Sequence, residues 1–216
     1  MAETRVIPSK EVFVNCPFDP SYKPIFDAII FCVSAAGFQP RCSLECDDAS
    51  EIRIAKILRM IGECPYGIHD ISFSQLDPSS GLPRFNMPFE LGIFLGCKSF
   101  GSKIQKAKIA LVLDKEPYRY QKSLSDLSGM DIKYHANDPK QAVGAVRQWI
   151  RVVSRRQDIP GPDSIWKLYE HFTRALPRIC RIQQIRPEEL TFVDYADIVN
   201  RWLRESKRSR TASITK

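Results

Sequence analysis

Two carboxyl residues of this 216-residue chain have the type and setting for chemistry at a sugar carbon. Glu90 is the single ionisable residue in the apolar stretch MPFELGIFLG, and Asp70 follows the apolar segment YGIH. A carboxylate held in a crevice by the helix it starts remains ionised and can act as a nucleophile or stabilise an oxocarbenium-like sugar carbon. Glu90 and Asp70 are therefore the candidate catalytic residues.

A structural role for Glu90 competes with the catalytic one. Near the start of a helix, a carboxylate is stabilised by the helix dipole and by free N–H groups, with Asn86 or a neighbour as the cap. The sequence leaves both interpretations open.

Polar and aromatic residues near the two carboxyl residues are candidates for binding a substrate. Arg84, which lies six residues before Glu90, fits a substrate that carries a phosphate. Asp19 precedes a proline and is also typical of a turn, and Asn15 could instead cap backbone groups of its loop. Asp47 and Asp48, followed by Ser50 and Glu51, are typical of a helix N-cap, and Arg53 on the same helix could also face a phosphate. The candidate substrate-binding residues are Asn15, Phe18, Asp19, Ser72, Arg84 and Asn86.

The cysteines and histidines do not form a recognisable metal motif. Seven cysteines are scattered singly through the chain, without a CxxC pair, and there are three histidines. Cys42 and Cys46 are separated by three residues, and no second pair of ligands accompanies them. We therefore expect no metal and no other cofactor, and we expect reduced thiols in a cytoplasmic protein.

Short β-branched or aromatic runs alternate with longer segments of helical period, which is typical of βαβ units. The strands are predicted at 11–15, 38–44, 66–71, 108–113 and 132–135. Helices are predicted at 22–36, 50–62, 88–97 and 138–155. Right-handed crossovers then favour a doubly wound, five-stranded parallel sheet of order 2-1-3-4-5, an α/β fold of the flavodoxin-like type.

In such a sheet, ligands bind beyond the carboxyl ends of the strands, where the strand order reverses. This rule selects the loops after the first and third strands, which hold Asn15 and Asp70. Glu90 lies in the helix that follows the third strand. The predicted topology therefore gathers the candidate residues in one crevice.

Three motifs in this order resemble one superfamily. They are VFVNCPFD at the first strand, HDIS at the end of the third strand and MPFELGIFLG in the following helix. The combination is similar to nucleoside 2-deoxyribosyltransferases, related nucleotide N-glycosidases and Toll/interleukin-receptor-like (TIR-like) domains of bacterial defence systems, over roughly residues 10–150. The resemblance implies that Glu90 attacks or stabilises C1′ of a ribose and that Asp70 handles the base or sugar hydroxyls.

Two functions from different classes follow from this resemblance. The first is a nucleotide N-glycosidase that cleaves an N-ribosyl bond in NAD⁺ or a related nucleotide, for which the resemblance implies a setting in antiviral defence. The alternative is a noncatalytic TIR-like module that binds a nucleotide signal or serves as a scaffold. The stretch Arg84-Phe85-Asn86 differs from the small, acidic segment that precedes the glutamate in the transferases, which argues against a plain deoxyribosyl transfer.

The sequence pattern changes near residue 158, where DIPGP interrupts the helical periodicity. We expect an α/β domain at 1–157, a helical appendage at 158–206 with helices at 163–174 and 187–204, and a disordered basic tail at 207–216. The aromatic residues of the appendage must be buried against an apolar surface, either on the first domain or on another chain. The second choice would make the protein a homo-oligomer or bring in a partner protein.

The positive charge is concentrated in the same region. Residues 1–146 carry 17 basic and 17 acidic side chains, whereas residues 147–216 carry 15 and 8. We do not expect nucleic acid as a partner, because the basic segment lacks a recognisable reading motif. No apolar run reaches the length of a membrane span, and no secretory signal is apparent at the start, so no membrane partner is expected.

Overall fold

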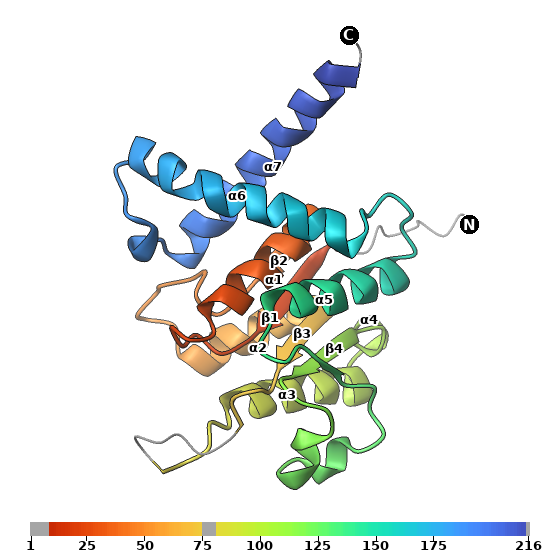
Figure 1. The fold of residues 1–216 in the computed structure, drawn as a ribbon. Coiled ribbons are helices and arrows are strands. Elements are labelled where there is room, and N and C mark those ends of the chain that lie inside the picture. Colours follow the sequence, from red (N-terminus) through yellow and green to blue (C-terminus); the bar gives the residue numbers. More distant parts are fainter. Residues whose placement is uncertain (1–8, 75–80, 215–216) are drawn as a thin grey trace, which may run out of the picture.

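The computed structural model describes residues 9–74 and 81–214, and it describes side chains up to Arg208. Its centre is one parallel sheet with the strand order β2-β1-β3-β4-β5 (Figure 1). The fold class and strand order predicted from the sequence are confirmed. The strands are β1 Glu11–Asn15, β2 Gln39–Arg41, β3 Tyr66–Asp70, β4 Ile109–Asp114 and β5 Lys133–Tyr134.

The register of the strands places their polar ends at one edge of the sheet. Asn15, the last residue of β1, pairs with His69 in β3. Asp70, the last residue of β3, pairs with Leu113 in β4. Because all the strands are parallel, the loops that leave these ends emerge on the same side, as the topological rule requires.

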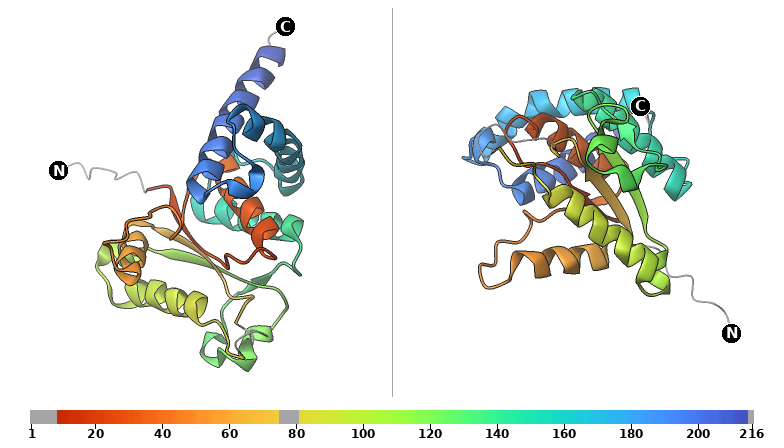
Figure 2. Two further views of the ribbon diagram at one scale, coloured as in Figure 1. Left: turned by 90° about the vertical axis from the view of Figure 1, so that its left-hand side faces the viewer. Right: turned by 90° about the horizontal axis from the view of Figure 1, so that it is seen from below.

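Helices cover both faces of the sheet (Figure 2). Helices α1 Lys23–Ala35 and α5 Pro139–Ser154 pack together on one face, while α2 Arg53–Glu63 and α3 Asn86–Phe100 pack on the other. The short helix α4 Lys103–Lys106 follows α3, and the turns η1 Arg119–Lys122 and η2 Ser125–Leu127 connect β4 to β5.

Helix α1 is apolar on nearly every side, and the structure gives the reason. Ten of its 13 residues are buried. On one side α1 packs with α5 on the sheet, and on the other side it is covered by a third layer, made of α6 Pro162–Ile182 and α7 Phe192–Ile214. The ring of Phe31 packs against Tyr169, Phe172 and Trp202 of this layer. The aromatic face of the C-terminal helices therefore covers the first domain of the same chain.

The break at 158–162 is pinned to the body of the protein. Arg147 donates hydrogen bonds to the carbonyl oxygens of Ile159 at 2.9 Å and Pro160 at 2.6 Å. Arg156 donates to the carbonyl of Ala36 at 2.8 Å. Ile159 is buried in the same apolar cluster as α1 and the C-terminal helices. One hydrophobic core thus continues across the predicted domain boundary.

Two helix ends of the first domain carry recognisable capping residues, whereas α2 begins after Ile52 without a hydrogen bond from a capping side chain, so the acidic cap predicted there is not formed. Gly37 has φ of +78°, the left-handed conformation expected just after a helix. Its N–H donates to the carbonyl of Ser34 at 2.9 Å, and that of Phe38 donates to Val33 at 3.1 Å. Asp138 accepts a hydrogen bond from the backbone of Lys140 at 2.9 Å and begins α5.

Several predicted boundaries are wrong, among them the start of the last helix, which was predicted at 187 and lies at Phe192. Strand β2 is shorter than 38–44, because the chain turns after Arg41 and the Glu45 N–H donates to the carbonyl of Cys42. Helix α6 continues through Pro177 to Ile182, where Cys180 packs in the core. Helix α7 continues to Ile214, so residues 207–214 are helical where disorder was predicted, and this end projects from the body (Figure 1). Residues 215–216 of the predicted tail lie outside the described residues.

A buried lysine holds the end of helix α2. Lys108 is 2% exposed, and its ammonium group donates to the carbonyls of Ile61 and Cys64. A cation at this position stabilises the carbonyl end of a helix.

All seven cysteines are free thiols. Among the helices of the described residues, none has the length and apolarity required to pass through a membrane.

Candidate functional site

A cavity of about 280 Å³ opens at the carboxyl end of β1, beside the first turn of α3. We call it the Glu90 cavity. Six of the eight residues predicted from the sequence line it, and Asp70 and Ser72 do not. The lining residues are Val14, Asn15, Cys16, Pro17, Phe18, Asp19, Pro20, Ser43, Arg53, Arg84, Asn86, Met87 and Glu90.

Glu90 occupies the fifth position of α3, beyond the first turn of the helix. The residue that caps the helix is Phe85, without a hydrogen bond from its side chain, and the first turn contains no acidic residue. Glu90 is only 6% exposed, and its carboxyl group makes no hydrogen bond to the described residues. The capping interpretation of Glu90 and Asn86 is therefore wrong.

Burial raises the pKa of Glu90 to about 7, and the positive charge of Arg53 opposes this change. The cause is desolvation, which disfavours the charged form of a carboxyl group. In the free protein at neutral pH, protonated and ionised Glu90 are thus present in comparable amounts. This differs from the permanently ionised carboxylate that the sequence suggested. A cationic group bound in the cavity would shift Glu90 toward the ionised form.

Asn15 ties the cavity wall to the sheet. Its amide nitrogen donates to the carbonyl of Met87 in α3 at 2.9 Å and lies 3.1 Å from Nδ1 of His69. Because this nitrogen is a donor, Nδ1 of His69 accepts and the ring proton sits on Nε2. Burial lowers the pKa of His69 to about 3, so the ring is neutral. Asn15 positions the start of α3 and hence the helix that carries Glu90.

His69 packs on the α3 side of the sheet, and Gly67 makes this packing possible. The rings of His69 and Phe94 lie 4.9 Å apart, edge to face. A Cβ atom on Gly67 would stand 2.6 Å from Nε2 of His69 and 2.8 Å from the Phe94 ring. A side chain at position 67 would therefore force α3 away from β3. Sequence reasoning missed this role of Gly67, which a pattern of alternating residues does not reveal.

Two arginines and one aspartate form the polar side of the Glu90 cavity. Arg84 makes an ion pair with Asp19, which joins the loop at 17–20 to the segment before α3. Arg53 lies at the start of α2 and approaches the hydroxyl of Ser43 at 3.5 Å. The sequence named Arg53 only as a possible phosphate contact, and the structure places it in the cavity with Glu90.

Asp70 belongs to a separate, sealed network. It is 0% exposed, and its Oδ2 accepts from the hydroxyl of Tyr22 at 2.6 Å and lies 2.9 Å from Nε2 of His135. Oδ1 accepts from the backbone of Ser72 at 2.8 Å. The expectation that Asp70 and Ser72 face the same crevice as Glu90 is wrong, because both side chains are turned into the protein.

The tautomer of His135 follows from its neighbours. The backbone N–H of Asn137 donates to Nδ1 at 3.1 Å, so the ring proton is on Nε2, toward Asp70. The hydroxyl of Ser72 lies 3.0 Å from the same nitrogen. Cys16 lines the Glu90 cavity above this network, and burial raises the pKa of its thiol well above the usual range, with Asp70 contributing. The thiol is therefore protonated and a poor nucleophile.

Comparison with known protein families, with curated proteins and with solved structures found no match to this chain. Among the described residues, no group of three or more histidine, cysteine or acidic side chains is arranged to hold a metal ion. The site must therefore be interpreted from its own geometry, together with the motif resemblance.

Proposed function

We propose that this protein is an N-glycosidase that cleaves the bond between a ribose and a pyridinium base, as found in NAD⁺ and related nucleotides. Glu90 is the catalytic carboxylate. The observation that carries the proposal is a buried carboxyl group on the wall of a cavity, without a hydrogen-bond partner among the described residues, beside two arginines. A buried ionisable group with a displaced pKa in a cavity is a typical active-site residue.

The carboxyl groups of the Glu90 cavity favour a pyridinium leaving group. Glycosidases that act on neutral leaving groups use two carboxyl groups, one of which donates a proton. In the Glu90 cavity the other carboxylate, Asp19, is held in an ion pair with Arg84, and Asp70 is sealed away. A pyridinium base needs no proton, because the electron pair of the breaking bond neutralises its nitrogen. One carboxylate therefore suffices.

The reaction assigned to the site is hydrolysis with one bond broken and one formed. The C1′–N bond breaks and leaves its electron pair on the pyridine nitrogen, while ionised Glu90 stabilises the positive charge that develops at C1′. Water then adds to C1′ and loses one proton to solvent. The cationic substrate itself favours the ionised form of Glu90, which offsets the raised pKa of the free protein.

The arginines supply the anion contact that a nucleotide requires. Arg53 and Arg84 line the same cavity as Glu90, and a guanidinium group binds phosphate oxygens through paired hydrogen bonds. The volume of about 280 Å³ lies just below the range of about 300–1,000 Å³ that is usual for small-molecule sites, and it suits a ribose with its phosphate better than a whole dinucleotide.

We expect Glu90→Gln to abolish cleavage while the fold is retained. The amide has nearly the same volume, but it cannot stabilise the cationic sugar, and the rate should fall by several orders of magnitude. The test is incubation with NAD⁺, nicotinamide mononucleotide and a panel of neutral-base nucleotides, followed by chromatography of the products and a thermal melt on the same preparation.

Glu63→Gln is the matched control, because Glu63 is a half-exposed glutamate at the far end of α2. It should retain full turnover. Wild-type turnover in Glu90→Gln would show that Glu90 does not carry the reaction. Loss of turnover in both variants would show that the effect is not specific to the cavity.

The sealed position of Asp70 favours one alternative, a TIR-like module that binds a nucleotide signal without converting it. In that case the wild-type protein would bind nucleotides in calorimetry and form no product with any of them. Glu90→Gln would then change affinity alone.

A further inference from the structure

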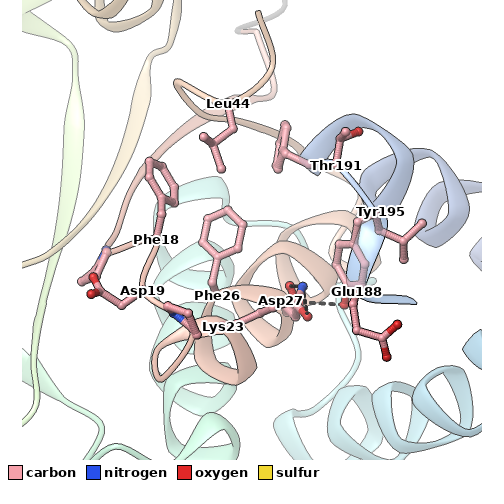
Figure 3. Close-up of a pocket in the computed structure, with 13 residues that line it drawn as sticks. Phe18, Asp19, Lys23, Phe26, Asp27, Leu44, Glu188, Thr191 and Tyr195 are labelled. Atoms are coloured by element: carbon pink, nitrogen blue, oxygen red, sulfur yellow. Dashed lines mark hydrogen bonds and ion pairs between the residues drawn. The ribbon is translucent and has the colours of Figure 1, made fainter. Parts of the chain in front are cut away.

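A second cavity, of about 500 Å³, lies on the other side of the loop at 17–20. We call it the Phe26 cavity (Figure 3). Residues 17–20 line both cavities. The opposite wall comes from η3 Pro187–Glu189 and the first turn of α7, which are far away in the sequence. The lining residues are Pro17, Phe18, Asp19, Pro20, Lys23, Phe26, Asp27, Leu44, Glu188, Leu190, Thr191, Phe192 and Tyr195.

Aromatic rings dominate the walls of this cavity. Phe26 stands between Phe18 on one side and Tyr195 on the other (Figure 3). Phe18 meets Phe26 edge to face with ring centres 5.5 Å apart, and Phe26 lies 6.2 Å from Phe192. Leu44 is 44% exposed and stands beside Phe18 at the rim. Such walls offer flat apolar faces on which a planar ring can stack.

The charges of the lining select the kind of ring. Three carboxyl residues, Asp19, Asp27 and Glu188, line the cavity, against one basic residue, Lys23. Lys23 is bound to Asp27 at 2.8 Å and Asp19 is paired with Arg84, so Glu188 is the lining carboxyl residue whose charge no ion pair among the described residues offsets. Glu188 is exposed at the rim. A ligand with amino or amidine donors is therefore favoured, and an anionic ligand is disfavoured.

We propose that the Phe26 cavity is a second ligand site, which binds a planar aromatic ring that carries amino groups, such as a free purine base. Its volume falls within the range of about 300–1,000 Å³ that is usual for small-molecule sites. This site is distinct from the Glu90 cavity and does not depend on the chemistry proposed for Glu90. The C-terminal helices, which the sequence treated as an appendage, form one of its walls.

The first test is binding of three small probes to the full chain by calorimetry. Benzamidine and benzoate share a ring but carry opposite charges, and adenine is a neutral ring with an amino group. We expect adenine and benzamidine to bind, and benzoate to bind at least about tenfold more weakly than benzamidine. Equal or tighter binding of benzoate would overturn the proposal.

The second test fills the mouth of the cavity. Leu44→Trp adds a bulky ring at a half-exposed rim position, so the fold should survive, and the affinity for adenine and benzamidine should fall at least about tenfold. Leu58→Trp is the matched control, because Leu58 is 48% exposed on α2 and lines neither cavity. Unchanged binding in Leu44→Trp, or an equal loss in Leu58→Trp, would place the ligand elsewhere.

The same titrations separate this site from the Glu90 cavity. Glu90→Gln should bind adenine and benzamidine as the wild-type protein does, whether or not the protein cleaves nucleotides. A loss of adenine binding in Glu90→Gln would contradict a second site. Turnover without adenine binding would overturn the second site and leave the proposed function standing.

Discussion

Glu90 combines burial with a position in the second turn of a helix, and this makes the stability of the fold depend on pH. Its carboxyl group titrates near 4.5 in the unfolded chain and at about 7 in the folded one. Between these values the folded protein binds more protons, so the contribution of Glu90 to stability falls as the pH rises. Below pH 4.5 the group is protonated in both states and the penalty is absent.

We therefore predict that Glu90→Gln is more stable than the wild-type protein at pH 8, by ~3 kcal/mol, and that the advantage vanishes near pH 4. Denaturant unfolding of both proteins across this range measures the difference, and other titrating groups cancel in it. A variant that is less stable at every pH would show that Glu90 makes a favourable native contact instead.

Asp70 and its hydrogen-bond donors form a buried network. In the wild-type protein, the two carboxylate oxygens of Asp70 face three donors, those of Tyr22, His135 and Ser72. In Asp70→Asn one of these oxygens becomes an N–H₂ group, which is a donor and faces other donors. We predict a loss of ~2–4 kcal/mol, because a buried donor is left without an acceptor.

The measurement for Asp70→Asn is a thermal melt beside Asp131→Asn, which changes an exposed aspartate and should leave the melting temperature unchanged. A normal melt combined with lost turnover would contradict the structural role and return Asp70 to the catalytic residues.

At the scale of elements, helix α3 carries the catalytic candidate and is held at its start by Asn15 and along its length by the Phe94–His69 contact. Both contacts come from strands β1 and β3, where the strand order reverses. The position of Glu90 is thus fixed by the sheet rather than by the loop before α3. Helix α2, held by Lys108 at its far end, brings Arg53 to the same cavity.

The far end of helix α7 is a separate case. Leu203 is the last core residue among those whose side chains are described, although the helix continues to Ile214. We predict that deletion of residues 207–216 changes the melting temperature by less than about 2 °C, because no described core residue is removed. Differential scanning calorimetry checks this, and a larger fall would show that the end of α7 is docked.

At the scale of the whole molecule, the C-terminal helices complete the core. Truncation after Gln157 would uncover α1, whose Phe31 packs against three aromatic rings of α6 and α7. The sequence alone suggested a separate α/β domain at 1–157, and such a domain would stay folded as a fragment. We now predict that it loses cooperative unfolding or aggregates, since a long apolar face meets water.

Calorimetry and analytical ultracentrifugation of the truncated chain test this prediction. A monomer with a sharp thermal transition would contradict it and would restore the sheet domain as an independent unit. As the matched control, a chain that ends at residue 206 keeps the packed parts of both helices and should melt like the full chain.

The sequence by itself determined the fold class, the strand order and the loops that meet at the site. These follow from local signals, namely apolar periodicity, helix caps and the fixed hand of the crossovers, and so Asn15, Phe18, Asp19, Arg84, Asn86 and Glu90 all fall in one cavity. Burial of Glu90 was also foreseeable, because a single charge in an apolar helix has few alternatives.

Only the tertiary structure decided which side chains face the cavity and what covers α1. Asp70 turns inward because Tyr22 and His135, from 48 residues before and 65 residues after it, supply its hydrogen bonds. The Phe26 cavity is lined by residues 17–20 and by residues from 188–195. These segments are far apart in the sequence, and no local sequence pattern predicts that they meet. Side-chain direction and long-range packing depend on which elements meet in space, and a sequence read segment by segment does not contain that information.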